Sequence, residues 1–152
     1  MSWYGALKVL HILAAVVWIG GGVMFAMVTT RLLSSRDRTA LGAVIPQMAR
    51  QLGAAGGPAS GIVLLTGIAM VLVGHIGFSV LWVRLGFGGI LLHALFGAFV
   101  MRKRTMKLIE AVSVPSTDET EVARAGARLR SGMFAYLALM VSVVAVMVLK
   151  PL

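Results

Sequence analysis

Four stretches of the 152-residue sequence contain no Asp, Glu, Lys or Arg: 9–30, 51–83, 85–101 and 131–149. A helix needs about 20 consecutive apolar residues to cross the hydrocarbon core of a bilayer. Helices satisfy their own backbone polar groups, which a bilayer requires. The sequence therefore predicts an all-α integral membrane protein. Residues 1–152 are expected to form one four-helix bundle with spans at about 5–30, 53–74, 80–101 and 131–149.

The composition leaves no room for a separate soluble domain. Apolar residues make up 59% of the chain and charged residues 12%, whereas soluble domains average about 25% charged residues. The longest polar stretch, about 102–130, is too short to bury a core of its own. The chain has no cysteine, which excludes disulfides and thiolate metal sites.

The net charge of +9 is concentrated between the predicted spans. Residues 31–50 hold four of the 14 basic residues and residues 102–130 hold seven, so 11 lie in two connections on one side of the bundle. Basic connections stay in the cytoplasm, which predicts a multi-pass protein of the bacterial inner membrane with both termini outside. We therefore expect membrane lipid, and no nucleic acid, beside these charges.

The connections also carry signals for helix boundaries. Apolar residues recur at helical spacing in 41–48, where Pro46 should end or kink a short amphipathic helix. The short segment 75–79 makes spans two and three an antiparallel hairpin. Val114-Pro115 should end the third helix, and Ser116 with Glu119 resembles a capping box that opens the fourth.

Glycines mark one face of the second span. Gly53, Gly57 and Gly61 follow each other at four-residue spacing, the pattern that lets membrane helices approach closely. Two interpretations remain open: the glycines pack against another helix, or the flat edge of a cofactor lies against them.

The three histidines, His11, His75 and His93, all lie in the uncharged stretches. An imidazole inside an apolar bundle is costly unless it has a partner, so histidine ligation is the predicted chemistry. His75 falls at the expected outer turn and is interpreted as an interfacial loop residue. For His11 and His93, a hydrogen-bonded histidine without metal is the alternative to ligation.

His11 and His93 each lie on a face that could hold a planar cofactor. Residues at spacings of three and four place Lys8, Trp18 and Gly22 on the face of His11. Glycines flank His93 at four-residue spacing, Gly89 before and Gly97 after, and would leave clearance for a macrocycle. Haem iron is often held by axial histidine, and helix bundles build cofactor sites from facing side chains.

Depth argues against one iron shared by both histidines. His11 lies on the outer side of its helix centre and His93 on the inner side, a difference of roughly 13 Å at 1.5 Å per residue. Two separate sites, or one site using His11 with another partner, fit better. Arg84 and Lys8 lie near the outer boundary, where they either snorkel to water or hold an anionic group such as a porphyrin propionate or a quinol oxygen.

Other metal chemistry has weaker support. No acidic residue lies in any span, which argues against a carboxylate relay or carboxylate-ligated metal. Met24 and Met27 are one turn apart and could ligate copper, although flexible apolar packing explains the ten methionines as well.

Three motifs resemble a known superfamily of small bacterial membrane proteins. Leu7-Lys8-Val9-Leu10-His11, followed by Val17-Trp18-Ile19-Gly20-Gly21, is similar to the opening of HemJ-type protoporphyrinogen oxidases and of the CopD-type copper-resistance domain. Leu81-Trp82-Val83-Arg84-Leu85 with His93 downstream resembles the third helix of the HemJ type, and Leu64-Leu65-Thr66-Gly67 the second helix of the wider group.

The resemblance implies a four-helix bundle with b-type haem that oxidises a porphyrinogen or delivers electrons to quinone. His11 matches the first-helix histidine that serves haem in that group. Arg84 stands where the HemJ type has a lysine, and arginine cannot lose its proton to act as a base. This departure favours an uncharacterised relative over a HemJ-type oxidase.

The expected function is that of an inner-membrane redox protein that binds haem b, forms a homo-oligomer and uses quinone or porphyrinogen as its partner. Whether it is an enzyme of the protoporphyrinogen oxidase kind is left open. The alternatives are a CopD-like copper protein and a cofactor-free scaffold subunit. His11 and His93 are the predicted iron ligands, and the predicted cofactor-binding residues are His11, His93, Arg84, Lys8, Trp18, Gly22, Gly89 and Gly97.

Overall fold

The computed structural model describes residues 3–151, and every regular element in that range is helical. Two of the elements, η1 and η2, are π-helical segments within longer helices. In chain order the elements are α1 (Trp3–Ser35), α2 (Arg38–Gln51), η1 (Leu52–Gly56), α3 (Gly57–Val73), α4 (Leu81–Leu95), η2 (Phe96–Met101), α5 (Arg102–Ser113) and α6 (Glu119–Leu149).

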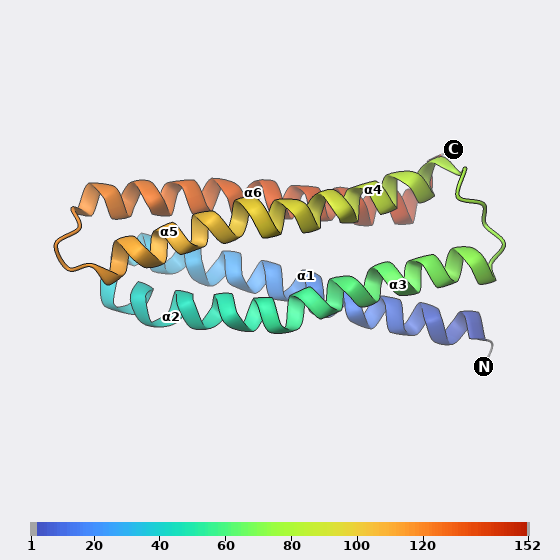
Figure 1. Ribbon diagram of the computed structural model, residues 1–152, viewed down its shortest axis with the longest axis horizontal. Helices are drawn as coiled ribbons and strands as arrows, with labels where there is room; N and C mark the ends of the chain where they lie inside the picture. The colour runs from blue at the N-terminus through green and yellow to red at the C-terminus, as the bar shows by residue number, and fades with distance from the viewer. Residues whose placement is uncertain (1–2, 152) are drawn as a thin grey trace.

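These elements form four long helices (Figure 1). The segments α2, η1 and α3 follow each other without a break over Arg38–Val73, and α4, η2 and α5 do so over Leu81–Ser113. Together with α1 and α6, they give four helices long and apolar enough to cross a membrane. The predicted four-helix membrane bundle is confirmed.

Both chain ends lie at one end of the bundle (Figure 1). Residues 74–80, between α3 and α4, lie at that same end, here named the terminal end. Residues 36–37 and 114–118 lie at the opposite end, here named the basic end because the chain around them carries most of the Lys and Arg. The two basic connections therefore share one side, as predicted.

The helices are longer at the basic end than the predicted spans. The third span is predicted to end near residue 101, but the helix continues through α5 to Ser113. At this end all four helices share one buried cluster. Its members are Phe25, Ala26, Leu41, Ile45, Met101, Leu108, Val112, Leu129 and Met133. The connections between spans are therefore mostly helical extensions of the spans and share a core with them.

Two predicted helix boundaries need correction. Pro46 does not end its helix: α2 runs through it to Gln51 because Leu41 and Ile45, on the same helix, are buried in the cluster at the basic end. That packing offsets the hydrogen bond that proline removes. The capping box at Ser116 is also wrong, since α6 begins only at Glu119 and Asp118 is its N-cap.

Asp118 caps α6 through Thr120. Its carboxylate accepts hydrogen bonds from the Thr120 hydroxyl at 2.5 Å and the Thr120 backbone N–H at 3.4 Å. These bonds, led by the one from the hydroxyl, lower the pKa of Asp118. An ionised carboxylate at this position also suits the positive end of the helix dipole.

Arg38 joins the two basic connections. Its guanidinium donates hydrogen bonds to the carbonyl oxygens of Ala111 at 2.8 Å, Thr117 at 3.0 Å and Val112 at 3.3 Å, and also to that of Val114. These carbonyls belong to the C-terminal end of α5 and the segment after it, where intrahelical partners run out. Arg38 therefore fixes the start of α2 against the end of α5.

Candidate functional site

The bundle contains two cavities that share one wall residue, Trp18. The larger has a volume of about 750 Å³ and the smaller about 350 Å³. Both fall in the range of about 300–1,000 Å³ that is usual for ligand pockets. His93 lines the larger cavity and His11 the smaller, so the two histidines face different spaces.

The larger cavity lies between the two long helices that each contain a π-helical segment. One wall comes from Arg38–Val73 and the other from Leu81–Ser113, with α1 and α6 closing the remaining sides. Both π-helical segments, Leu52–Gly56 and Phe96–Met101, contribute lining residues. Segments of this kind often occur at functional sites because they displace the helix from its regular path.

His93 is held between two aromatic rings in the wall of the larger cavity. Its side chain is 1% exposed. Trp18 meets it edge to face with ring centroids 4.6 Å apart, and Tyr136 covers one face at 3.8 Å with an interplanar angle of 34°. The Nε2 atom is buried and has no hydrogen-bond partner. A buried polar atom without a partner is uncommon and costly, and it requires an explanation.

Glycines leave one wall of this cavity open. A Cβ atom added at Gly53 or Gly57 would meet nothing within 4 Å, and both residues line the cavity. A Cβ at Gly61 would also meet nothing within 4 Å, although Gly61 does not line the cavity. Within the described residues, therefore, no other helix of the chain packs against these three glycines, and the cofactor interpretation stays a prediction.

The glycines near His93 have the opposite surroundings. A Cβ at Gly89 would lie 2.6 Å from Val143, and one at Gly97 would lie 3.3 Å from the Tyr136 ring. The space predicted as clearance for a macrocycle on this face is thus filled by side chains of α6. Gly22 likewise faces Met140, at 3.5 Å from an added Cβ. Gly22 and Gly97 still line the larger cavity, but Gly89 lines neither cavity.

Two arginines stand at the edge of the larger cavity. Arg50 precedes the uncharged stretch 51–83, and Arg102 follows the uncharged stretch 85–101. The two helices are antiparallel, so both arginines fall at the boundary of the apolar region on the side of the basic end. Both side chains are exposed. They make this edge of the cavity suitable for an anionic group.

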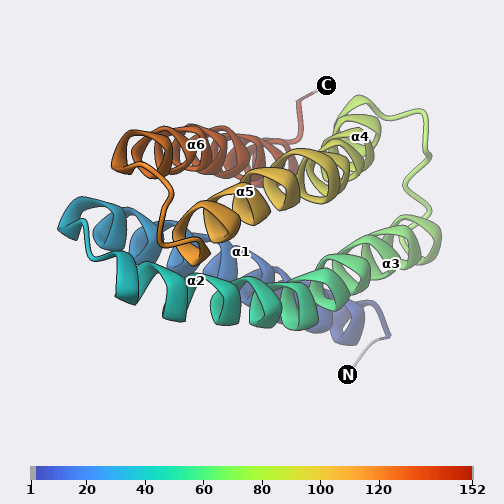
Figure 2. The same ribbon diagram turned by 60° about the vertical axis from the view of Figure 1, so that its left-hand side comes forward.

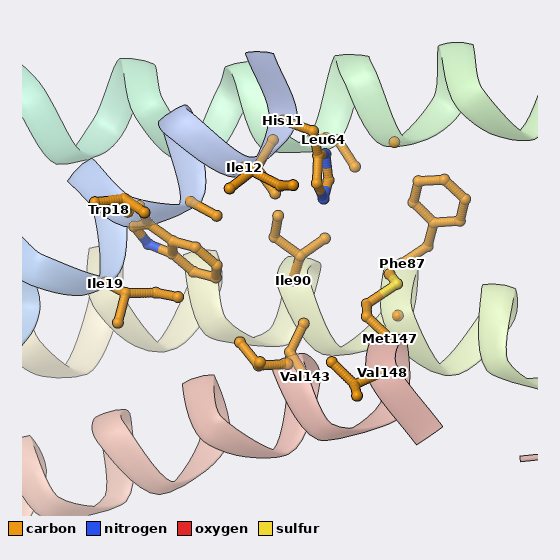
Figure 3. A pocket seen from close by; sticks show the side chains of 16 residues that line it. His11, Ile12, Trp18, Ile19, Leu64, Phe87, Ile90, Val143, Met147 and Val148 are labelled. Atoms are coloured by element: carbon orange, nitrogen blue, oxygen red, sulfur yellow. The ribbon is translucent and has the colours of Figure 1, made fainter. Parts of the chain in front are cut away.

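The smaller cavity lies toward the terminal end and receives residues from all four long helices (Figure 3). Its lining is apolar apart from the Trp18 indole N–H and the imidazole of His11, which points from α1 into the space (Figure 3). Figure 3 also shows Trp18 and Phe87 on opposite sides of this space. The lining residues are His11, Ile12, Ala15, Val16, Trp18, Ile19, Val63, Leu64, Gly67, Gly86, Phe87, Ile90, Val143, Val144, Met147 and Val148.

Thr66 orients His11. Its Oγ1 lies 2.8 Å from His11 Nδ1, and the same hydroxyl lies 2.6 Å from the carbonyl oxygen of Ile62. A threonine hydroxyl has one proton, which it donates to Ile62, so the oxygen accepts from Nδ1–H of His11. The neutral imidazole then carries its lone pair on Nε2. This is the tautomer that accepts a hydrogen bond or ligates a metal through Nε2.

The other predicted site residues lie outside both cavities. Lys8 is exposed, with Nζ 5.4 Å from the centre of the Tyr4 ring. Arg84 is exposed on α4 and lines neither cavity. His75 lies in the connection between α3 and α4, as predicted, with a φ of 50°.

The structure gives no support to a copper cluster. Met24 and Met27 are 59% and 67% exposed and line neither cavity. Among residues 3–151, no group of three or more His, Cys, Asp or Glu side chains could hold a metal ion.

Sequence reasoning missed four residues that shape the cavities: Thr66, Tyr136, Arg50 and Arg102. Thr66 was noticed only as part of the Leu64–Gly67 motif, although a hydroxyl in an apolar span is itself a signal for a polar partner. Tyr136 is the only tyrosine in the uncharged stretch 131–149. Both arginines were counted only as part of the charge pattern.

Comparison with protein families gives one match that covers nearly the whole chain. Residues 5–151 match the family described as predicted integral membrane protein, DUF2269. The chain belongs to this family. Neither the curated proteins nor the solved structures include a match to this DUF2269 protein. The family match supports a membrane protein and carries no assignment to the HemJ or CopD types.

Proposed function

We propose that this DUF2269 protein binds b-type haem in the larger cavity and acts as a membrane redox protein, with His93 as the axial ligand. The observation that carries the proposal is the buried Nε2 of His93, which has no partner in the wall of a cavity of about 750 Å³. An axial histidine ligand would satisfy that atom.

The rest of the cavity suits a flat ring with acidic substituents. The wall at Gly53 and Gly57 has no side chain that would keep a ring from the backbone. Arg50 and Arg102, at the edge, offer charge-assisted hydrogen bonds to carboxylates such as haem propionates. They take over the role that the sequence predicted for Arg84 and Lys8. Haem, once bound, supplies reversible one-electron transfer.

Tyr136 controls access to the ligand. Its ring covers a face of His93 at 3.8 Å and lies next to Gly97, in the space that a macrocycle on His93 would need, so haem would enter only when this ring moves. A smaller residue at position 136 should therefore ease haem uptake. Trp18 lines both cavities and keeps its edge against His93, so it limits rotation of the imidazole.

The finer expectations from the sequence belong to the same proposal. The protein would lie in the bacterial inner membrane with its basic end in the cytoplasm, and it would exchange electrons with a quinone or a porphyrinogen. Gly61, on the same ridge but outside the larger cavity, is free of intramolecular packing, which leaves room for contact with a second copy in a homo-oligomer.

Absorption spectroscopy of the purified protein, expressed with ample haem, tests the proposal. We expect a Soret band at near-stoichiometric haem, loss of most of the bound haem in His93→Ala, and no loss in His75→Ala. Tyr136→Leu should bind at least as much haem as the native chain. A band lost in His11→Ala but kept in His93→Ala would move ligation to the smaller cavity. A colourless native protein would overturn the haem proposal.

A further inference from the structure

Among the side chains that line the smaller cavity, His11 and Trp18 carry polar atoms, and the Trp18 indole N–H has Tyr136 as its hydrogen-bond partner. Thr66 holds His11 with Nδ1–H as donor, at 2.8 Å, which leaves the Nε2 lone pair as the free position of the ring. The other lining residues are apolar or aromatic. A ligand that fits must therefore be mostly apolar and must present one hydrogen-bond donor to His11.

The surroundings exclude a charged headgroup. No Lys, Arg, Asp or Glu lines the cavity. Lys8 and Arg84, the basic residues nearest to it in sequence, are exposed outside it. A phosphate or carboxylate placed here would lose its hydration without gaining a counter-charge. The ligand must therefore be neutral.

The cavity is continuous with the apolar outside of the bundle. Ile12 and Val16 of α1, which line it, are 52% and 62% exposed, and Val148 of α6 is 73% exposed. The helices α3 and α4 also diverge toward the terminal end (Figure 2), and the cavity is lined by both. A ligand can thus enter sideways from lipid and leave an apolar tail outside.

Aromatic side chains favour a ring. Trp18 and Phe87 flank the space into which the His11 imidazole points (Figure 3). Gly67 adds a close backbone surface, since a Cβ there would lie 3.6 Å from the His11 ring and 3.9 Å from Phe87. Aromatic rings contact each other with favourable offset or edge-to-face geometry. A planar headgroup is therefore a better fit than a fatty alcohol.

From these features we infer that the smaller cavity binds the headgroup of a lipid-soluble hydroquinone, with a hydroquinone O–H donating to Nε2 of His11. The fixed tautomer predicts a preference: the hydroquinone, which donates, binds more tightly than the corresponding quinone, which can only accept. This inference deepens the proposed redox function by naming its membrane partner, but the binding itself does not require haem.

Binding titrations on the cofactor-free full chain in detergent micelles test the inference. The probes are decylhydroquinone, decylquinone, the dimethyl ether of decylhydroquinone and decanol. For the native chain we expect decylhydroquinone to bind about 3- to 10-fold more tightly than the ether or the quinone, the range given by one net hydrogen bond. His11→Ala should remove this difference, whereas the matched variant His75→Ala should retain it.

Thr66→Val provides a second variant if His11→Ala does not fold. Without the Thr66 oxygen, the His11 ring keeps only the backbone carbonyl of Val63 as a partner, so its tautomer is held less firmly and the preference for hydroquinone over quinone should fall toward equality. Equal binding of hydroquinone and ether to the native chain would overturn the inference, as would decanol binding as tightly as hydroquinone. A colourless protein that still shows the preference would sink only the haem proposal.

Discussion

The hydroxyl of Thr66 and the Nδ1 atom of His11 lie 2.8 Å apart, across the contact between α3 and α1. Because that hydroxyl gives its proton to Ile62, the pair fixes which nitrogen of His11 is protonated. One hydrogen bond thus decides whether the smaller cavity offers a donor or an acceptor.

The tautomer of His11 can be determined directly by NMR spectroscopy. In protein labelled with ¹⁵N at histidine, His11 should show a protonated Nδ1 and an unprotonated Nε2. Thr66→Val should shift the population toward the Nε2–H form, and Thr66→Ser, which keeps the hydroxyl, should not. An Nε2–H signal for His11 in the native chain would contradict the geometry at Thr66.

The glycines of α4 provide a matched pair for helix packing. A Cβ at Gly89 would lie 2.6 Å from Val143 of α6, whereas one at Gly88 would meet nothing within 4 Å. Gly89→Ala should lower the free energy of unfolding by about 1–3 kcal/mol through overpacking. Gly88→Ala should leave it unchanged or slightly higher, because alanine favours helix. The free energy of unfolding of both variants can be measured in a series of denaturing detergent concentrations. Equal stability of the two variants would show that α4 and α6 are farther apart than the 2.6 Å contact at Gly89 requires.

Arg38 should stabilise the basic end more than other arginines do. Arg38→Ala removes the donors to the carbonyls of Ala111, Val112, Val114 and Thr117. We expect a loss of about 1–3 kcal/mol in the free energy of unfolding, since bonds from charged donors are among the stronger ones.

Two measurements test the role of Arg38. Protease cleavage within residues 114–118 should become faster in Arg38→Ala than in the native chain. Arg38→Lys should restore little, because an ammonium cannot span several carbonyls as a guanidinium does. Arg31→Ala, at an exposed position on α1, is the control and should cleave like the native chain.

The absence of cysteine makes the orientation easy to test. Ser79 lies in the connection at the terminal end and Ser116 in the connection at the basic end. The positive-inside rule predicts that an impermeant maleimide added to intact cells labels Ser79→Cys, and that it labels Ser116→Cys only after the membrane is opened. The reverse pattern would place the basic end outside.

Much of the fold was predictable because its signals are local. A run without charge needs no partner to be recognised as a span, and Val114-Pro115 ends α5 at Ser113 through its own backbone restriction. That the helix does not end at Pro46 was not predictable, for the opposite reason. Whether a helix continues past a proline depends on what its neighbours bury, and Ile45 is 0% exposed beside it.

The candidate sites were predictable only in part. The sequence singled out His11 and His93 because polar groups in apolar spans are rare. It could not tell that Gly89 packs against Val143 while Gly53 faces open space, since both lie on helix faces where glycines recur. Which face of a helix meets a neighbour depends on how the helix is rotated in the bundle.

By itself, the sequence determined the membrane class, the number of spans, the side on which the charges gather and the presence of histidines within the spans. These follow from solvation, because each is decided by how single residues partition between water and lipid. Only the tertiary structure decided that Thr66 orients His11, that Tyr136 and Trp18 enclose His93, and that Arg50 and Arg102 line the same cavity. Those relationships join residues far apart in the chain, and packing between helices alone brings them together.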